Sequence, residues 1–205
     1  ITHFDYLNYR YRNMVVNGEI SEGNFNGKFQ VKDPNLSLLF DGIASFGADT
    51  SKYVFKAKVD SANLYAMNLV KDSLAQYKGS LDIDFTYLDA EHWEGRIDLF
   101  DLHYRNSKKQ FAFNDVNIKS LGLDSLKELI VKSDMVDAQL KGSYSYAGLA
   151  QFFEQKIKRY QLPQNQRGQG ISPPEFSFDL WVKDAQDLSQ SLLSQLLIEP
   201  GTHLN

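Results

Sequence analysis

The sequence predicts a mainly β fold, an extended antiparallel sheet followed near the C-terminal end by two short amphipathic helices. Three observations lead to this prediction. Apolar and polar residues alternate with a period of two through most of the chain, clusters of Gly, Pro, Asn, Asp and Ser separate the alternating segments, and a helical period begins only after Tyr146. The clearest case is 77–104, where two alternating strands, each opened by a glycine, flank a short acidic turn.

The first half of the chain predicts short strands joined by tight turns. Residues 4–11 are rich in tyrosine and alternate as one strand. Turn-forming residues gather at 21–24 and 33–35, so that strands are expected at 14–20, 25–31, 36–40 and 53–59. The pattern is looser at 42–49. The apolar stripe of 62–74 is too short for a helix, and we expect a loop with one helical turn there.

The second half repeats the alternation with two changes of phase. Leu102 and Tyr104 fall out of phase with Ile97 and Leu99, so a bulge or turn near 99–101 is needed to keep one face apolar. A second change of phase occurs at Asp115, and further strands are expected at 111–118, 126–132, 136–146 and 176–182.

Two apolar stripes near the C-terminal end have helical spacing. The first lies in 147–162 and ends before Pro163. A polar segment rich in Gly and Pro, 163–174, is expected to be a mobile loop, and 175–205 is expected to hold a strand and a second helix that begins near Asp184. We expect both helices to cap the sheet; the alternative for the first is a helix that lies on a membrane surface or a partner.

Composition excludes several classes of protein. The net charge is -4 and the basic residues are scattered, which argues against a nucleic-acid partner. The chain has no cysteine and therefore no disulfide framework or thiolate metal site, which fits either cytosol or periplasm. No apolar run approaches the roughly 20 residues of a membrane helix.

The 205 residues fit one large β domain. We expect a segment of a longer polypeptide, because the first residues already alternate as a strand and no initiator Met is present.

Three clusters of side chains are candidates for sites of chemistry or binding. A metal site would use His92 with Glu91, Glu94 and His103, but His92 is expected in a turn, so none is predicted. A glycosidase needs two carboxyls about 5 to 10 Å apart in a cleft, and no cleft is specified for Asp82, Asp84, Asp89 and Glu91. A carbohydrate-binding or adhesive β-sandwich module is the alternative function, with sugars stacking on Tyr9, Tyr11, Trp93, Tyr104 and Trp181. We expect neither an enzyme nor a cofactor.

A short unit recurs along the chain, an apolar residue and a spacer followed by glycine and a strand. It appears as FNGKF at 25–29, YKGSL at 77–81, WEGRI at 93–97 and LKGSY at 140–144. Such strand-by-strand similarity favours an extended or solenoid-like sheet, and an ordinary sandwich meander fits the same pattern equally well.

The order of these segments resembles the repeat region of the TamB family, the translocation and assembly module proteins related to AsmA-like lipid transporters. The segments that carry the resemblance are NFNGKFQVKDPNLSLLFDGIASFG, KYVFKAKVDSANLYAMNLV, YKGSLDIDFTYLDAEHWEGRIDL, IVKSDMVDAQLKGSYSY and DAQDLSQSLLSQLL. Together they cover most of the chain. No single segment is diagnostic, and the resemblance rests on their occurring together in this order.

The resemblance implies that residues 1–146 curl into a U-shaped, taco-like β-groove with an apolar interior. It implies an internal segment of a periplasmic protein that is anchored in the inner membrane, meets an Omp85-type outer-membrane barrel through regions outside this chain, and passes phospholipid acyl chains along the groove. The groove-lining residues expected to bind lipid are Phe29, Val31, Leu38, Phe40, Phe55, Val59, Leu81, Ile83, Phe85, Ile97, Leu99, Phe111 and Phe113.

Overall fold

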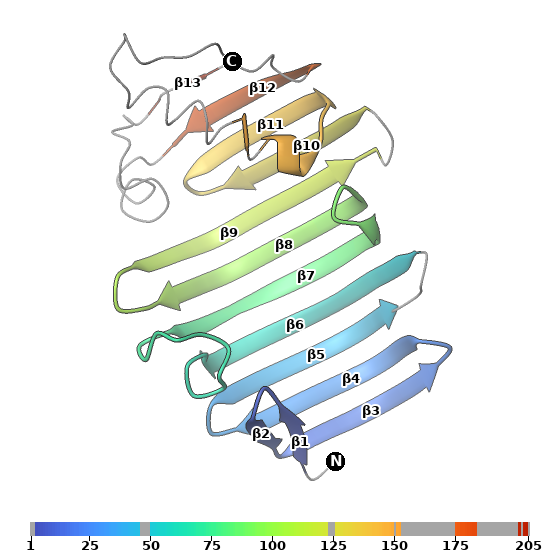
Figure 1. Ribbon diagram of the computed structural model, residues 1–205, viewed down its shortest axis with the longest axis vertical. Helices are drawn as coiled ribbons and strands as arrows, with labels where there is room; N and C mark the ends of the chain where they lie inside the picture. Colours follow the sequence, from blue (N-terminus) through green and yellow to red (C-terminus); the bar gives the residue numbers. More distant parts are fainter. Residues whose placement is uncertain are drawn as a thin grey trace.

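The computed structural model describes residues 3–45, 50–122, 126–149, 151–152, 175–183, 201 and 203–204. They form an eleven-stranded antiparallel sheet and a separate two-stranded hairpin, in which each strand pairs with its neighbours in sequence (Figure 1). The hairpin is β1 (His3–Tyr6) and β2 (Tyr9–Arg12). The sheet runs in order through β3 (Met14–Ser21), β4 (Asn24–Asp33), β5 (Leu36–Ser45), β6 (Ser51–Asn63), β7 (Gln76–Asp89), β8 (His92–Arg105), β9 (Gln110–Leu121), β10 (Lys127–Ser133), β11 (Val136–Ser143), β12 (Glu175–Val182) and β13 (His203–Leu204).

The mainly β, antiparallel fold predicted from the alternation is confirmed. The strand order is that of one continuous meander, so the two-sheet sandwich is wrong for the described residues. One local prediction is also wrong: 4–11 is not a single strand, because Leu7 and Asn8 both take a positive φ and turn the chain back on itself. Residues 64–68 form a turn, as expected.

Little of the two predicted helices lies within the described residues. Helical residues are 146–149 and 151–152, and the first turn is capped by Ser145, whose Oγ accepts a hydrogen bond from the Gly148 amide at 2.9 Å. The remainder of 147–162, the segment 163–174 and the helix expected from Asp184 lie outside the described residues. In the described part of the chain, no helix has the length and apolar character needed to span a membrane.

A line of irregular pairing crosses the middle strands near one end. The register shifts at Ser37/Leu38 between β5 and β6, at Val59/Ala62 between β6 and β7, and at Lys78/Ser80 between β7 and β8. Asp101 in β8 has a φ of 49°. This is the bulge that the phase change required, and it returns Leu102 and Tyr104 to the face of Leu99. Bulges bend strands locally and increase their twist, so the strands deviate from a flat sheet along this line.

The recurring glycine unit marks places where strands approach closely. Gly95 lies opposite Phe85 with a φ of 140°, and a Cβ built on it would stand 2.6 Å from the Phe85 Cβ. Gly142 repeats the arrangement opposite Phe176, with a φ of 151° and a distance of 2.9 Å. Only glycine has a backbone that adopts such a φ without strain, and an aromatic residue opposite glycine covers the bare backbone. Two of the four repeated units are therefore cross-strand glycine–aromatic pairs, whereas Gly27 lies between Gly18 and Gly42, and Gly79 lies opposite Val59.

Two small cores lie at the ends of the sheet. At the N-terminal end, the β1–β2 hairpin and the turn after β6 bring Tyr11, Met14, Val31, Ala62 and Met67 together. At the other end Met135 and Val182 pack together, and Val182 is fully buried. Between these cores the sheet is a single layer in the described part of the chain.

Candidate functional site

The apolar face of the sheet is the candidate site, because the pairing register aligns its side chains in rows that run across the strands. Phe29, Phe40, Leu81 and Leu99 lie in one row, and Phe55, Ile83 and Ile97 lie in the next. Residues directly opposite each other in paired strands share a face. By this criterion all the residues predicted to line the groove stand on the same face, including Phe111 opposite Tyr104 and Phe113 opposite Leu102.

The predicted lining residues fall into two groups. Val31 is buried in the N-terminal core, and Phe29, Leu38 and Val59 pack against it. Phe113 packs against the core around Met135. The remaining members are half-buried and belong to neither core: Phe40, Phe55, Leu81, Ile83, Phe85, Ile97, Leu99 and Phe111. They define the central apolar face, the part of the sheet available for a ligand.

Aromatic residues that were not included in the predicted set extend this central face. Phe25 contacts Phe40 with ring centroids 5.8 Å apart, and Tyr53 contacts Phe85 at 5.1 Å. Trp93 stands 6.0 Å from the Phe85 ring, edge to face. The alternation in the sequence places Phe25 and Tyr53 on the apolar face, and this pattern was sufficient to find them.

The opposite face carries a ladder of ion pairs along one row. Lys28 pairs with Asp41 at 2.9 Å and Lys56 pairs with Asp82 at 3.1 Å. Arg96 then reaches both Asp82, at 3.5 Å, and Asp98, at 2.8 Å. Asp82 and Asp98 are direct cross-strand partners, so the guanidinium separates two like charges that would otherwise repel. These ion pairs make the face opposite the apolar side chains the polar, water-facing side of the sheet.

The first turn of the helix after β11 is tied to the β7–β8 turn by an acid–base pair. The Glu91 carboxylate accepts hydrogen bonds from the backbone amides of Tyr146 at 2.6 Å and Ala147 at 3.0 Å, and these bonds lower its pKa. Lys127 is buried beside it, 3.8 Å from the carboxylate and 5.2 Å from the centre of the Tyr146 ring. Burial raises the pKa of the nearby Tyr144 hydroxyl, which has no hydrogen-bond partner among the described residues.

The residues considered for sugar stacking do not gather into one platform. Tyr11 is buried, and Tyr9 donates a hydrogen bond to Asp33. Trp93 is half-buried on the apolar face, whereas Trp181 is 53% exposed and its ring contacts that of His203.

The carboxylates considered for hydrolysis have structural partners. Asp82 belongs to the ion-pair ladder, Glu91 binds the first turn of the helix, and Asp89 lies 2.8 Å from the Nδ1 of His92, an interaction that lowers the pKa of Asp89. Asp84 is exposed. Within the described ranges, no three His, Asp or Glu side chains are grouped to hold a metal ion.

Comparison with known proteins adds no relative. No family model, no curated protein and no solved structure matches the chain.

Proposed function

We propose that this chain is a non-enzymatic segment of a TamB-like periplasmic protein, in which the central apolar face binds phospholipid acyl chains. The observation that carries the proposal is the row of half-buried apolar side chains that continues from strand to strand without a second sheet over it in the described part of the chain. A face of this kind resembles half of a protein core. Burial of acyl methylenes against it would gain about 0.8 kcal/mol each.

The bulges and the glycines support a sheet that curls into a U-shaped groove. Register shifts fall on successive strands along one line, and bulges of this kind are how curved sheets turn a corner. Gly42 and Gly95 allow the neighbouring strand to approach on the apolar side, where any Cβ would clash. A concave apolar side would enclose a chain-like ligand on more than one side.

The length of the sheet is consistent with a segment of a transport path rather than the whole of it. Eleven strands spaced about 4.8 Å apart extend roughly 50 Å, which is longer than one acyl chain and too short to join two membranes. In this proposal the parent protein is anchored in the inner membrane and meets an Omp85-type barrel at the outer membrane. It thus supports phospholipid transport and outer-membrane assembly.

Photo-crosslinking tests the proposal with a matched pair of positions. A crosslinking amino acid at Phe85 faces the apolar side, and the same amino acid at Asp84 faces the ion-pair side of the same strand. In cells that carry the parent protein, we expect phospholipid adducts at Phe85 and none at Asp84. Adducts only to protein at Phe85 would mean that the face is a packed core.

A charge placed on the same strand provides the second test. Ile83→Asp should abolish lipid capture while the chain stays folded, because an open face leaves the new carboxylate in contact with water. Thr86→Asp adds the same charge on the opposite face and is the control. Unfolding of the Ile83 variant alone would indicate a closed core. Glycan binding lost on Trp93→Ala would instead favour the carbohydrate-binding module.

A further inference from the structure

A cleft of about 440 Å³ opens at the end of the strands, beside the line of bulges. Its walls come from β6, β7, β8 and the start of β9 and include Lys78, His103, Arg105, Tyr104 and Phe111. Tyr104 and Phe111 belong to the apolar face, and their rings are in contact with centroids 5.1 Å apart. The cleft therefore lies at a rim where cationic side chains meet the end of the apolar rows.

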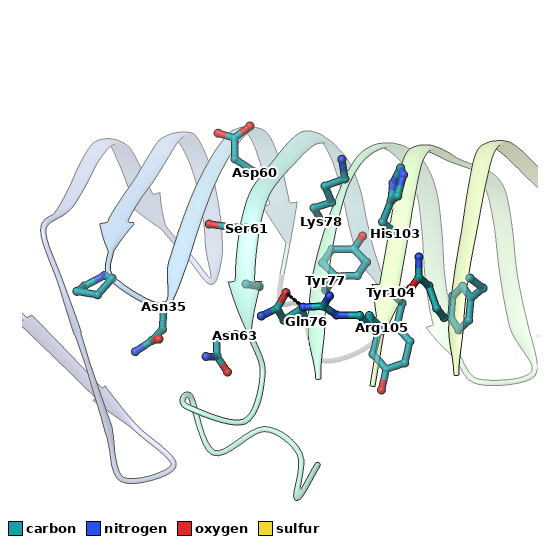
Figure 2. A pocket seen from close by; sticks show the side chains of 14 residues that line it. Asn35, Asp60, Ser61, Asn63, Gln76, Tyr77, Lys78, His103, Tyr104 and Arg105 are labelled. Atoms are coloured by element: carbon teal, nitrogen blue, oxygen red, sulfur yellow. Dashed lines mark hydrogen bonds between the residues drawn. The ribbon is translucent and has the colours of Figure 1, made fainter. Parts of the chain in front are cut away.

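The pairing of β7 with β8 holds two basic residues of the cleft, Lys78 and His103, close together. Lys78 and His103 are direct cross-strand partners, and Figure 2 shows both side chains projecting to the same side of neighbouring strands. Arg105 lies two residues from His103 and donates a hydrogen bond from Nη2 to the Gln76 Oε1 at 2.9 Å. Gln76 is neutral, so this bond orients the guanidinium without cancelling its charge.

The positive charge of the cleft is not compensated by the described residues. Lys78 and Arg105 form no ion pair in the part of the chain that the structure describes, in contrast to Lys28 and Lys56 on the same face of the sheet. The carboxylate that lines the cleft is Asp60, and it is already paired with Lys58 at 2.8 Å. A positive cleft in a chain of net charge -4 is a local feature that favours an anion.

We propose that this cleft binds a phosphate group, with Lys78 and Arg105 as its cationic ligands and the Nε2 of His103 as a further contact. The Nδ1 of His103 lies 2.9 Å from the carbonyl oxygen of Asp101 and donates to it, so Nε2 is the ring nitrogen left for the ligand. Nε2 donates to a phosphate oxygen when the ring is an imidazolium, and it accepts from a protonated phosphate oxygen when the ring is neutral. A guanidinium and an ammonium suit a phosphate ester because they supply several donors as well as charge. The aromatic rim beside them suits a phosphate carried by an amphiphile.

The source of the phosphate is either a lipid headgroup or a soluble phosphate ester. The lipid source rests on the function proposed above, since its acyl chains would continue from Phe111 onto the central apolar face. The phosphate site itself does not depend on that function, and three probes separate the two ideas: short-chain phosphatidylglycerol, the matching diacylglycerol without phosphate, and glycerol 3-phosphate.

The test compares two double variants of equal charge change by binding titration. Lys78→Gln with Arg105→Gln removes the cleft cations, and Lys119→Gln with Lys132→Gln removes two exposed lysines on the same face outside the cleft. We expect the first variant to weaken phosphatidylglycerol binding about tenfold and to leave diacylglycerol binding unchanged, and the second to change neither. Circular dichroism of both variants checks that the exposed substitutions leave the fold intact.

Each outcome bears on the proposal. Binding of glycerol 3-phosphate that depends on Lys78 and Arg105, with no lipid bound by the wild-type chain, would support the phosphate site and contradict the lipid-binding function. Lipid binding that is equally strong in the cleft variant, together with no cleft-dependent binding of glycerol 3-phosphate, would overturn the site. An equal loss in the Lys119 and Lys132 variant would overturn it too, because the effect would then reflect overall charge.

Discussion

Replacing Gly95 by alanine tests the close approach of β7 and β8 most directly. The new Cβ would lie 2.2 Å from the carbonyl oxygen of Asp84 and 2.5 Å from the Phe85 Cα, and both of these atoms belong to the backbone. The backbone of Gly95 also has a φ of 140°, which an alanine adopts only under strain. Strain of this kind costs about 1–3 kcal/mol and overpacking costs about another 1–3 kcal/mol. Because one local shift of the backbone relieves part of the strain and part of the overpacking, we expect the free energy of unfolding to fall by about 3–4 kcal/mol.

Urea unfolding followed by the fluorescence of Trp93 gives the measurement. Trp93 lies 6.0 Å from the Phe85 ring and reports on this part of the sheet, and a Trp181→Phe background removes the second tryptophan signal. With a urea dependence of about 2 kcal/mol per molar, the expected loss lowers the midpoint by about 1.5–2 M.

Gly201 provides a control that separates strain from steric clash. It has a φ of 80°, but a Cβ there would meet no atom within 4 Å, so alanine should cost only about 1 kcal/mol. If Gly95→Ala changed the free energy of unfolding by less than about 0.5 kcal/mol, the proposed fit of glycine against the facing phenylalanine would be refuted. Equal losses at the two positions would show that the clash contributes nothing.

Three further predictions concern other parts of the sheet. Val31→Ala should cost about 2–3 kcal/mol in urea unfolding because this side chain is 1% exposed, whereas Val15→Ala, at 59% exposure, should change stability by less than about 0.5 kcal/mol. Arg96→Gln should lower the free energy of unfolding by about 1–2 kcal/mol, because it leaves the buried Asp98 facing the carboxylate of Asp82. In a double-mutant cycle, neutralising Asp82 should restore the lost stability. Glu91 has a pKa lowered by hydrogen bonds from backbone amides, so its contribution to stability is complete above its unfolded value of about 4.3 and is lost as the pH falls through the folded value. Glu91→Gln should therefore flatten the acid limb of the pH–stability profile below about pH 5, and an unchanged limb would contradict the helix-capping role.

The strands were predictable from the sequence because their signals are local. Alternation and turn residues lie within a few positions of each other, and even the bulge at Asp101 follows from one change of phase. The turn at Leu7 and Asn8 was missed because it uses no glycine or proline, and leucine rarely takes a positive φ. The choice between a meander and a sandwich depends on which strands pair, and alternation within a strand does not encode that choice.

The apolar face could be predicted from the sequence, but its division into residues that pack in the end cores and residues that stay half-buried could not. Val31 and Phe55 have the same alternating context in the sequence. Val31 is buried because it packs in the core that contains Tyr11 and Met67, whereas Phe55 lies outside that core and is half-buried. These contacts join segments far apart in sequence. Glu91 is a similar case, since its partner amides lie more than fifty residues away in the chain.

The two faces of the sheet contribute differently to stability and to the proposed binding. Exposed ion pairs such as Lys28 with Asp41 contribute roughly 0–1 kcal/mol each, so the ladder fixes which side faces water more than it holds the strands together. The two core clusters of buried apolar side chains lie at the two ends of the sheet, whereas the residues of the central apolar face are half-buried and belong to neither cluster. Any ligand that covers those side chains stabilises this stretch in proportion to its occupancy. The stability of the middle strands and the filling of the apolar face are therefore coupled in the proposed function.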